Sequence, residues 1–147
     1  MTRFRPQRIV HDTPIGSLLK REITVLRPKG PELYKDPDYL AQVRECPCLY
    51  CGLDPCGEAA HLRMASGAYG KSSGMGKKPE DRWALPLCGS CHRDAKHAQH
   101  KRNEDEFWRS IGINPLLTAT KLYAQRGDLV AMRAVIFVAI SERGTLK

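Results

Sequence analysis

The sequence predicts a small α+β protein that is stapled by a metal site and flanked by a basic N-terminal arm and C-terminal helices. Two Cys-x-x-Cys units, Cys48–Cys51 and Cys88–Cys91, stand 36 residues apart. A short apolar segment at residues 83–87 leads into the second unit and predicts a strand. Helical spacing of apolar residues dominates the stretch after residue 104. At 147 residues, the chain suffices for one domain, or one small domain with arms.

Three segments follow from these patterns: an arm with a short helix at 1–45, a metal-bound core at 46–102 and a helical segment at 103–147. The arm, residues 1–33, lacks periodicity and carries four prolines. Residues 37–44 predict a helix, because Asp36 is suited to the N-cap and Pro37 to the first helical position. Pro47 ends this helix and opens the first cysteine turn.

The remaining elements follow in chain order. A Gly/Ser/Lys-rich loop precedes the strand, and a helix begins at the second cysteine unit. The C-terminal helices carry apolar residues at helical spacing, so we assign them to the core rather than to a site. These elements are a loop at 65–80, a strand at 83–87, and helices at 91–100, 104–111, 115–126 and 129–141, the last capped by Asp128.

Neither a leader nor a membrane span is expected. Residues 1–20 contain no apolar stretch of the length that a secretory signal needs. The apolar run at 129–140 is short and is interrupted by Arg133. Cysteines at metal spacing then favour a reduced metal protein of the cytoplasm, in a bacterial host cell, over a disulfide scaffold.

Positive charge is concentrated in two regions. The net charge is +8; residues 1–30 hold seven bases and two acids, and residues 61–102 hold nine bases and three acids. This pattern predicts a polyanionic partner, DNA or else RNA, although basic surfaces also serve solubility alone. The expected phosphate contacts are Arg63, Lys71, Lys77 and Lys78.

The four knuckle cysteines predict one structural zinc ion. Cys48, Cys51, Cys88 and Cys91 provide four thiolates, the usual ligand set of a closed tetrahedral site. Such a site clips two knuckles together in a chain with few large apolar residues. Cys46 and Cys56 are left over, and we interpret them as spare thiols rather than as replacement ligands.

Histidines cluster around the second knuckle. His92, His97 and His100 follow it, and His61 precedes it. Each alone fits a surface histidine on a polar helix. Taken together, three segments resemble the HNH, or ββα-metal, nuclease family. They are the run from Cys48 to Gly52, the segment Ala60-His61-Leu62-Arg63, and the run from Lys78 to His92, which ends in Pro-Leu-Cys-x-x-Cys-His. The segments 99–108 and 112–115 resemble its phage and prophage members.

The resemblance implies a β-hairpin followed by a helix, with one catalytic divalent metal, Mg²⁺ or Mn²⁺. His61 then resembles the general base, Asp81 the residue that orients the base or the hairpin loop, and His92 a metal ligand. His100 or His97 completes the metal site. Two positions differ from the family pattern: Ala60 stands where many members carry a metal ligand, with Glu58 two residues before it, and Lys96 stands at the second helix ligand.

Two functions compete on these grounds. The first is a metal-dependent endonuclease that hydrolyses DNA phosphodiester bonds. A neutral imidazole can take a proton from water near neutral pH, and a divalent cation can neutralise charge on the phosphate. The alternative is a non-catalytic zinc-containing module that binds nucleic acid. A zinc-ribbon adaptor for other proteins is a third, smaller possibility.

Overall fold

A two-stranded antiparallel sheet stands at the centre of the described residues, with helices before and after it. The computed structural model describes residues 34–72 and 78–144. These residues belong to the unit Leu33–Lys147, and the other unit of the chain is Met1–Glu32. The basic arm predicted over 1–33 and the predicted contact Lys77 therefore lie outside the described residues.

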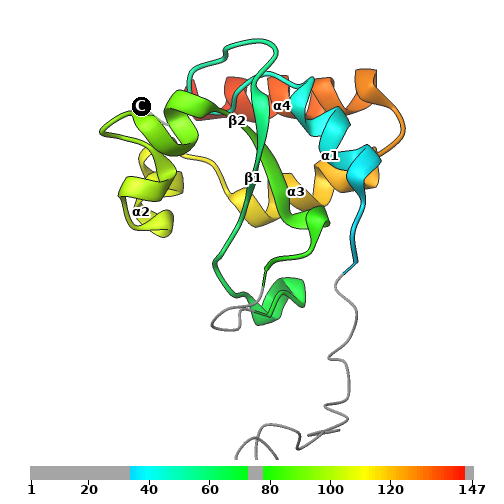
Figure 1. The fold of residues 1–147 in the computed structure, drawn as a ribbon, viewed down its shortest axis with the longest axis horizontal. Coiled ribbons are helices and arrows are strands. Elements are labelled where there is room, and N and C mark those ends of the chain that lie inside the picture. Colours follow the sequence, from blue (N-terminus) through cyan, green and yellow to red (C-terminus); the bar gives the residue numbers. More distant parts are fainter. Residues whose placement is uncertain (1–33, 73–77, 145–147) are drawn as a thin grey trace, which may run out of the picture. The chain divides into compact units, whose positions relative to one another are not determined.

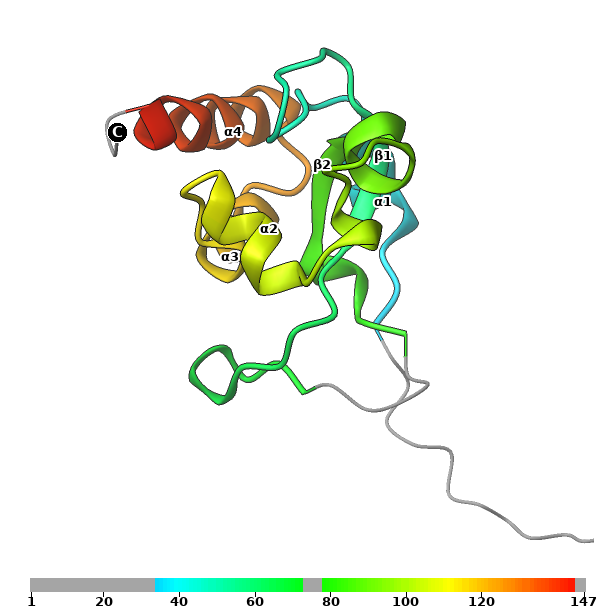
Figure 2. The ribbon, with the colours of Figure 1, turned by 90° about the vertical axis from the view of Figure 1, so that its left-hand side faces the viewer.

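The elements run in the order α1 (Pro37–Arg44), β1 (Gly57–His61), β2 (Ala84–Cys88), α2 (Glu104–Ser110), α3 (Pro115–Ala124) and α4 (Leu129–Gly144) (Figure 1). The predicted α+β class is confirmed. In Figure 2, α2, α3 and α4 all lie on one side of β2. Among the described residues, no helix combines the length and the apolar character needed to cross a bilayer.

Local chemistry sets the helix starts. The Asp36 carboxylate accepts from the Tyr39 N–H at 3.0 Å, so Asp36 caps α1 as predicted. Asn114 caps α3 and Asp128 caps α4 in the same way. The Asn103 side chain accepts from the N–H groups of Asp105 and Glu106 and so caps α2. Each of these helices therefore begins within one residue of the position that the sequence predicts.

The register of the hairpin decides which residues meet. β1 pairs with β2 from Gly57 opposite Cys88 to His61 opposite Ala84. β2 is buried along its whole length. On β1, Ala60 is fully buried, whereas His61 is partly exposed. Position 60 therefore faces the core, because side chains alternate along a strand.

A single core joins the hairpin to the helices on both sides of it in sequence. The Tyr39 hydroxyl of α1 donates a hydrogen bond to the Ala84 carbonyl. The Tyr39 ring also lies edge-to-face with the Tyr123 ring of α3, with centroids 4.9 Å apart. Phe107 and Trp108 of α2 and Met132 and Ile136 of α4 are buried in the same cluster. The predicted boundaries at 45/46 and 102/103 thus separate segments that share one core.

The helix predicted from Cys91 to His100 is wrong in its length. The chain makes one π-helical turn over Ser90–Asp94, and extended backbone at Ala95 (ψ 159°) ends it. A separate 3-10 turn follows at Gln99–Lys101. This break changes the direction of the chain, so His97 and His100 occupy positions that a continuous helix would not give them.

Candidate metal centre and adjoining imidazole cavity

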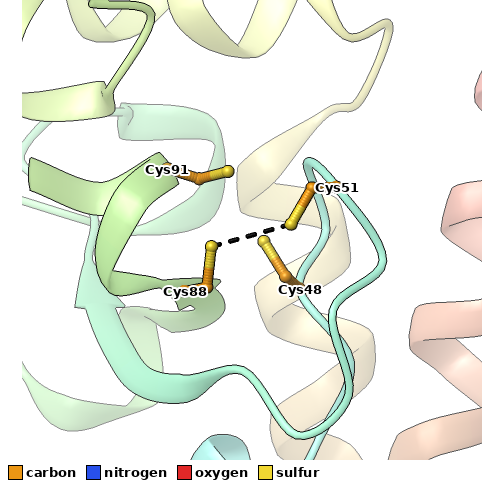
Figure 3. A group of neighbouring side chains, drawn as sticks. All are labelled: Cys48, Cys51, Cys88 and Cys91. Atoms are coloured by element: carbon orange, nitrogen blue, oxygen red, sulfur yellow. Dashed lines mark hydrogen bonds between the residues drawn. The ribbon is translucent and has the colours of Figure 1, made fainter. Parts of the chain in front are cut away.

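The four knuckle thiols converge on one point. The ligand atoms of Cys48, Cys51, Cys88 and Cys91 all lie within 4.8 Å of one another, and the sulfurs of Cys51 and Cys88 are 3.6 Å apart (Figure 3). Among the described residues, this is the group of Cys, His and acidic side chains arranged to hold a metal ion. Four soft sulfur donors this close together are a ligand set that zinc prefers, so the cluster is compatible with a bound zinc ion.

Backbone hydrogen bonds shape the first knuckle. The Cys48 N–H donates to Leu53 and the Gly52 N–H to Cys48, both at 2.8 Å. Gly52 has φ of +78°, a conformation that favours glycine, so the residue after Cys51 is fixed by the turn. Leu49 is fully buried, and its N–H donates to the Pro86 carbonyl of β2. These bonds hold the first knuckle against β2, which ends at Cys88 of the second knuckle.

The two remaining cysteines stand apart from the cluster. Cys46 and Cys56 are buried, and their thiols donate to the carbonyls of Gln42 and Glu58. Burial raises the pKa of Cys46 to about 11 and that of Cys56 to about 12. Both therefore stay protonated near neutral pH and serve as hydrogen-bond donors in the core, apart from the four clustered thiols.

A cavity of about 460 Å³ lies beside the hairpin, and most of the predicted catalytic and cationic residues line it. Its walls come from the α1 entrance, from β1 and the residues after it, from the segment before β2, and from the two turns after β2. The lining residues are Tyr34, Lys35, Ala59, His61, Arg63, Lys78, Pro79, Asp81, His92 and His100.

His61 is oriented by Asp81. The His61 Nε2 lies 2.9 Å from Asp81 Oδ1, and the other carboxylate oxygen accepts from the Asp36 N–H at 2.8 Å. An ionised carboxylate can only accept, so the His61 Nε2 carries the hydrogen. The Nδ1 atom is then the nitrogen of this ring that has a lone pair. It is the atom of His61 able to accept a proton.

His92 is oriented by Glu58. The His92 Nδ1 lies 2.7 Å from Glu58 Oε2, and the Arg93 guanidinium pairs with the same carboxylate. Burial alone would raise the pKa of Glu58, but the hydrogen bonds from Arg93 and His92 hold it below its ordinary value. By the same argument as for His61, the His92 Nε2 is left free as an acceptor or metal ligand.

His100 reaches His92 because the helix is broken. The two rings meet edge to face with centroids 4.4 Å apart. The His100 Nε2 accepts from the Arg63 guanidinium at 3.0 Å, since arginine can only donate. His97, the other candidate for this metal site, does not line the cavity; its Nε2 lies 3.7 Å from Cys91 Sγ.

The predicted phosphate contacts divide in two. Arg63 and Lys78 are exposed and line the cavity. Lys71 is only 4% exposed, and its ammonium donates to the Met64 carbonyl at 2.6 Å. The prediction of Lys71 as a surface contact is therefore corrected: it closes the turn in which Ser66 and Lys71 pair.

Two residues that hold the site in place are not part of the sequence prediction: Arg93 and Glu104. Arg93 pairs with the Glu58 carboxylate, and the Glu104 carboxylate accepts hydrogen bonds from a segment far away in the sequence. Glu104 accepts from the N–H groups of Arg63 and Met64, each at 2.9 Å, and from Gln99 at 2.7 Å. It thereby fixes the chain that follows His61. No local pattern marks Glu104, whereas Arg93 could have been noticed beside His92.

Comparison with known proteins gives a family for the chain and no function. No curated protein and no solved structure matches it. The sequence model of one family, described as "Protein of unknown function (DUF968)", matches residues 20–122. That span is more than two thirds of the chain, and it includes the four cysteines and every residue that lines the cavity. The chain therefore belongs to the DUF968 family.

Proposed function

We propose that this protein is an HNH-type, metal-dependent endonuclease that hydrolyses DNA phosphodiester bonds, with a structural zinc ion in the four-cysteine cluster. One observation carries the proposal: two oriented imidazoles, His61 with Asp81 and His92 with Glu58, open into one cavity with cationic walls. The order of hairpin and short helical turn supports the ββα-metal core that the resemblance implies.

His61 acts as the general base. Its Nδ1 takes the proton from a water molecule as the water oxygen attacks the phosphorus. The P–O bond opposite the attacking oxygen breaks, and the leaving oxygen keeps the electron pair and takes up a proton from solvent. Asp81 holds the ring in the required tautomer. The cationic side chains Arg63, Lys35 and Lys78 bind phosphate oxygens around the scissile bond.

The catalytic divalent ion, Mg²⁺ or Mn²⁺, is assigned to His92 through its free Nε2, with His100 beside it. When bound, such an ion neutralises charge on the phosphate. Glu58 orients His92 toward that role, as carboxylates commonly do for metal-bound histidines. The residue at position 60 is an alanine, and Glu58 is the acidic residue that β1 contains.

The alternative function is a non-catalytic zinc-containing module that binds nucleic acid. One observation favours it: the Arg63 guanidinium donates a hydrogen bond to His100 Nε2, so this nitrogen is not available to a metal ion. In that case the cavity binds a phosphate without cleaving it, and His61 and Asp81 serve only the structure.

Nicking of supercoiled plasmid tests the proposal. The zinc-loaded protein is expected to nick DNA with Mg²⁺ or Mn²⁺ and to stop when the chelator EDTA is added. His61→Ala should keep zinc and DNA binding but lose cleavage about 10²-fold or more. Lys96→Ala, at an exposed residue outside the cavity, is the control and should still nick DNA.

Cleavage by His61→Ala within a few-fold of the parent would refute the catalytic assignment. A parent protein that binds DNA but does not cut it with any divalent ion would instead establish the binding module.

A further inference from the structure

A zinc ion held by four thiolates carries an excess of negative charge. Coordinating thiols are deprotonated, so Zn²⁺ with four of them has a net charge of about −2. Cys48, Cys88 and Cys91 are buried, which makes that charge costly unless N–H donors reach the sulfurs. Outer contacts of this kind orient ligands and tune the metal.

Different donors reach different sulfurs of the cluster. Backbone N–H groups of Cys51, Cys88 and Tyr50 hydrogen-bond to Cys48, and the Leu53 N–H hydrogen-bonds to Cys51. The sulfur of Cys91 has a side-chain neighbour instead. A ring nitrogen, His97 Nε2, lies 3.7 Å from the Cys91 sulfur.

The His97 ring is held in place by aromatic stacking. It lies nearly parallel to the Tyr50 ring, with centroids 4.4 Å apart and an interplanar angle of 12°. Tyr50 stacks in turn on Phe107, which is fully buried in α2. Tyr50 belongs to the first knuckle and His97 follows the second, so this stack also ties the two knuckles together.

We propose that His97 is a positioning residue of the four-cysteine site: its Nε2–H donates a hydrogen bond to the Cys91 thiolate. This proposal rests on the zinc site proposed above and not on the nuclease activity. The bond offsets part of the negative charge and fixes the direction of the sulfur. It also makes the thiolate less nucleophilic, because a donated hydrogen bond withdraws charge from sulfur.

The position of the ring follows from the break after Asp94. Extended backbone at Ala95 turns the chain back, and the Ala98 N–H donates to the Ala95 carbonyl at 3.0 Å. His97 therefore faces the cluster, while His92, on the π-helical turn, faces the cavity. Two histidines five residues apart thus serve two different sites.

Three variants of the full-length chain separate the donor from the ring. His97→Phe keeps an aromatic ring for Tyr50 but removes the N–H. His97→Gln keeps an N–H donor but removes the ring. Lys96→Ala, at the exposed neighbour, is the matched control. Zinc affinity is measured by competition with a chromogenic chelator, and alkylation of Cys91 is followed by peptide mass mapping of the zinc-loaded protein.

His97→Phe is expected to weaken zinc binding about 10-fold or more and to speed alkylation of Cys91. His97→Gln should fall between it and the parent, and Lys96→Ala should match the parent. A His97→Phe protein whose zinc affinity and Cys91 alkylation rate stay within twofold of the parent overturns the proposal. If His97→Phe does not fold, His97→Gln is compared with His97→Leu, and equal zinc affinities overturn it.

The parent protein separates the two proposals. If the parent binds no zinc, the zinc site itself is wrong and this inference falls with it. If the parent binds zinc and the variants do not differ, only the role of His97 is wrong. Neither result depends on whether the protein cuts DNA.

Discussion

The cysteine cluster and the imidazole cavity are neighbours that differ in how complete they are. In the cluster, four cysteine sulfurs lie within 4.8 Å of one another. In the cavity, each of three imidazoles is bonded to a different charged partner: Asp81, Glu58 or Arg63. A closed set of ligands suits a structural ion, whereas a set with free nitrogens and open space suits a reactive site.

The two regions also differ in the interactions that hold them in place. The cluster is held by the backbone bonds of its knuckle, and by Arg143, which donates to the carbonyls of Leu49 and Tyr50 at 2.6 Å. The cavity is held by side-chain carboxylates that reach between segments. Loss of one thiolate ligand should therefore unfold the cysteine cluster, whereas loss of one carboxylate should only weaken metal binding in the cavity.

The largest effect is expected at the cluster. Cys88→Ser should abolish zinc binding and cooperative thermal unfolding, because structural zinc contributes about 10–16 kcal/mol in small domains, as much as the whole stability of many. Metal analysis and circular dichroism melts measure this. Cys46→Ala is the control, and it should keep one zinc ion per chain. Equal zinc content in the two variants would contradict the assignment of the ligands.

A smaller effect is expected at the cavity. Glu58→Gln should weaken Mn²⁺ binding about 10–100-fold, because His92 loses the carboxylate that orients it, while zinc content stays the same. Calorimetric titration with Mn²⁺ measures this. Asp54→Asn is the control, since Asp54 pairs with Arg133 and does not line the cavity. Equal Mn²⁺ affinities in the two variants would remove Glu58 and His92 from the metal site.

The two lysines provide a sharper comparison. Lys78→Ala should reduce the dependence of log K for DNA on log salt by about 0.9, the share of one phosphate contact. Lys71→Ala should leave that slope unchanged and lower the melting temperature instead, because its buried ammonium bonds to Met64. Fluorescence anisotropy at several salt concentrations measures the slopes. Equal slopes for the two variants would show that the cavity rim does not contact DNA.

The smallest effect concerns the two protonated thiols. Their pKa values, about 11 for Cys46 and about 12 for Cys56, lie above the ordinary 9.0. The folded state keeps protons that the unfolded state releases above pH 9, so the free energy of unfolding falls as pH rises through that range. The loss by pH 10 should be about 1–3 kcal/mol for the pair. Urea unfolding at pH 8 and pH 10 measures it, and Cys46→Ala should reduce the difference.

The sequence predicts the parts of this protein that depend on local chemistry. The start of α1 follows from Asp36 and Pro37, and the start of α4 from Asp128, because caps act within a few residues. The convergence of the four knuckle thiols follows from their spacing, since two Cys-x-x-Cys turns suit one tetrahedral ion.

Other features depend on contacts that no local pattern encodes. Residues 91–100 have a helical composition, yet the π-helical turn ends at Asp94, where the chain must return to the cluster. Lys71 stands in a Gly/Ser/Lys-rich loop typical of exposed chain, yet it is buried and its ammonium donates to the Met64 carbonyl. Glu104 reaches across 41 residues to Arg63, a separation that only the folded core explains.

The five-residue turn Ser90–Asp94 carries Cys91 and His92 side by side. Consecutive residues of a helical turn point in different directions, and here this difference separates the sulfur cluster from the cavity. An insertion or deletion of one residue would rotate one side chain away from its site whatever the new residue was. We therefore expect an insertion or deletion between positions 88 and 92 to be tolerated far less well than a substitution at Ser90. In a library of insertions and deletions across this turn, nearly all functional variants should keep the parent length.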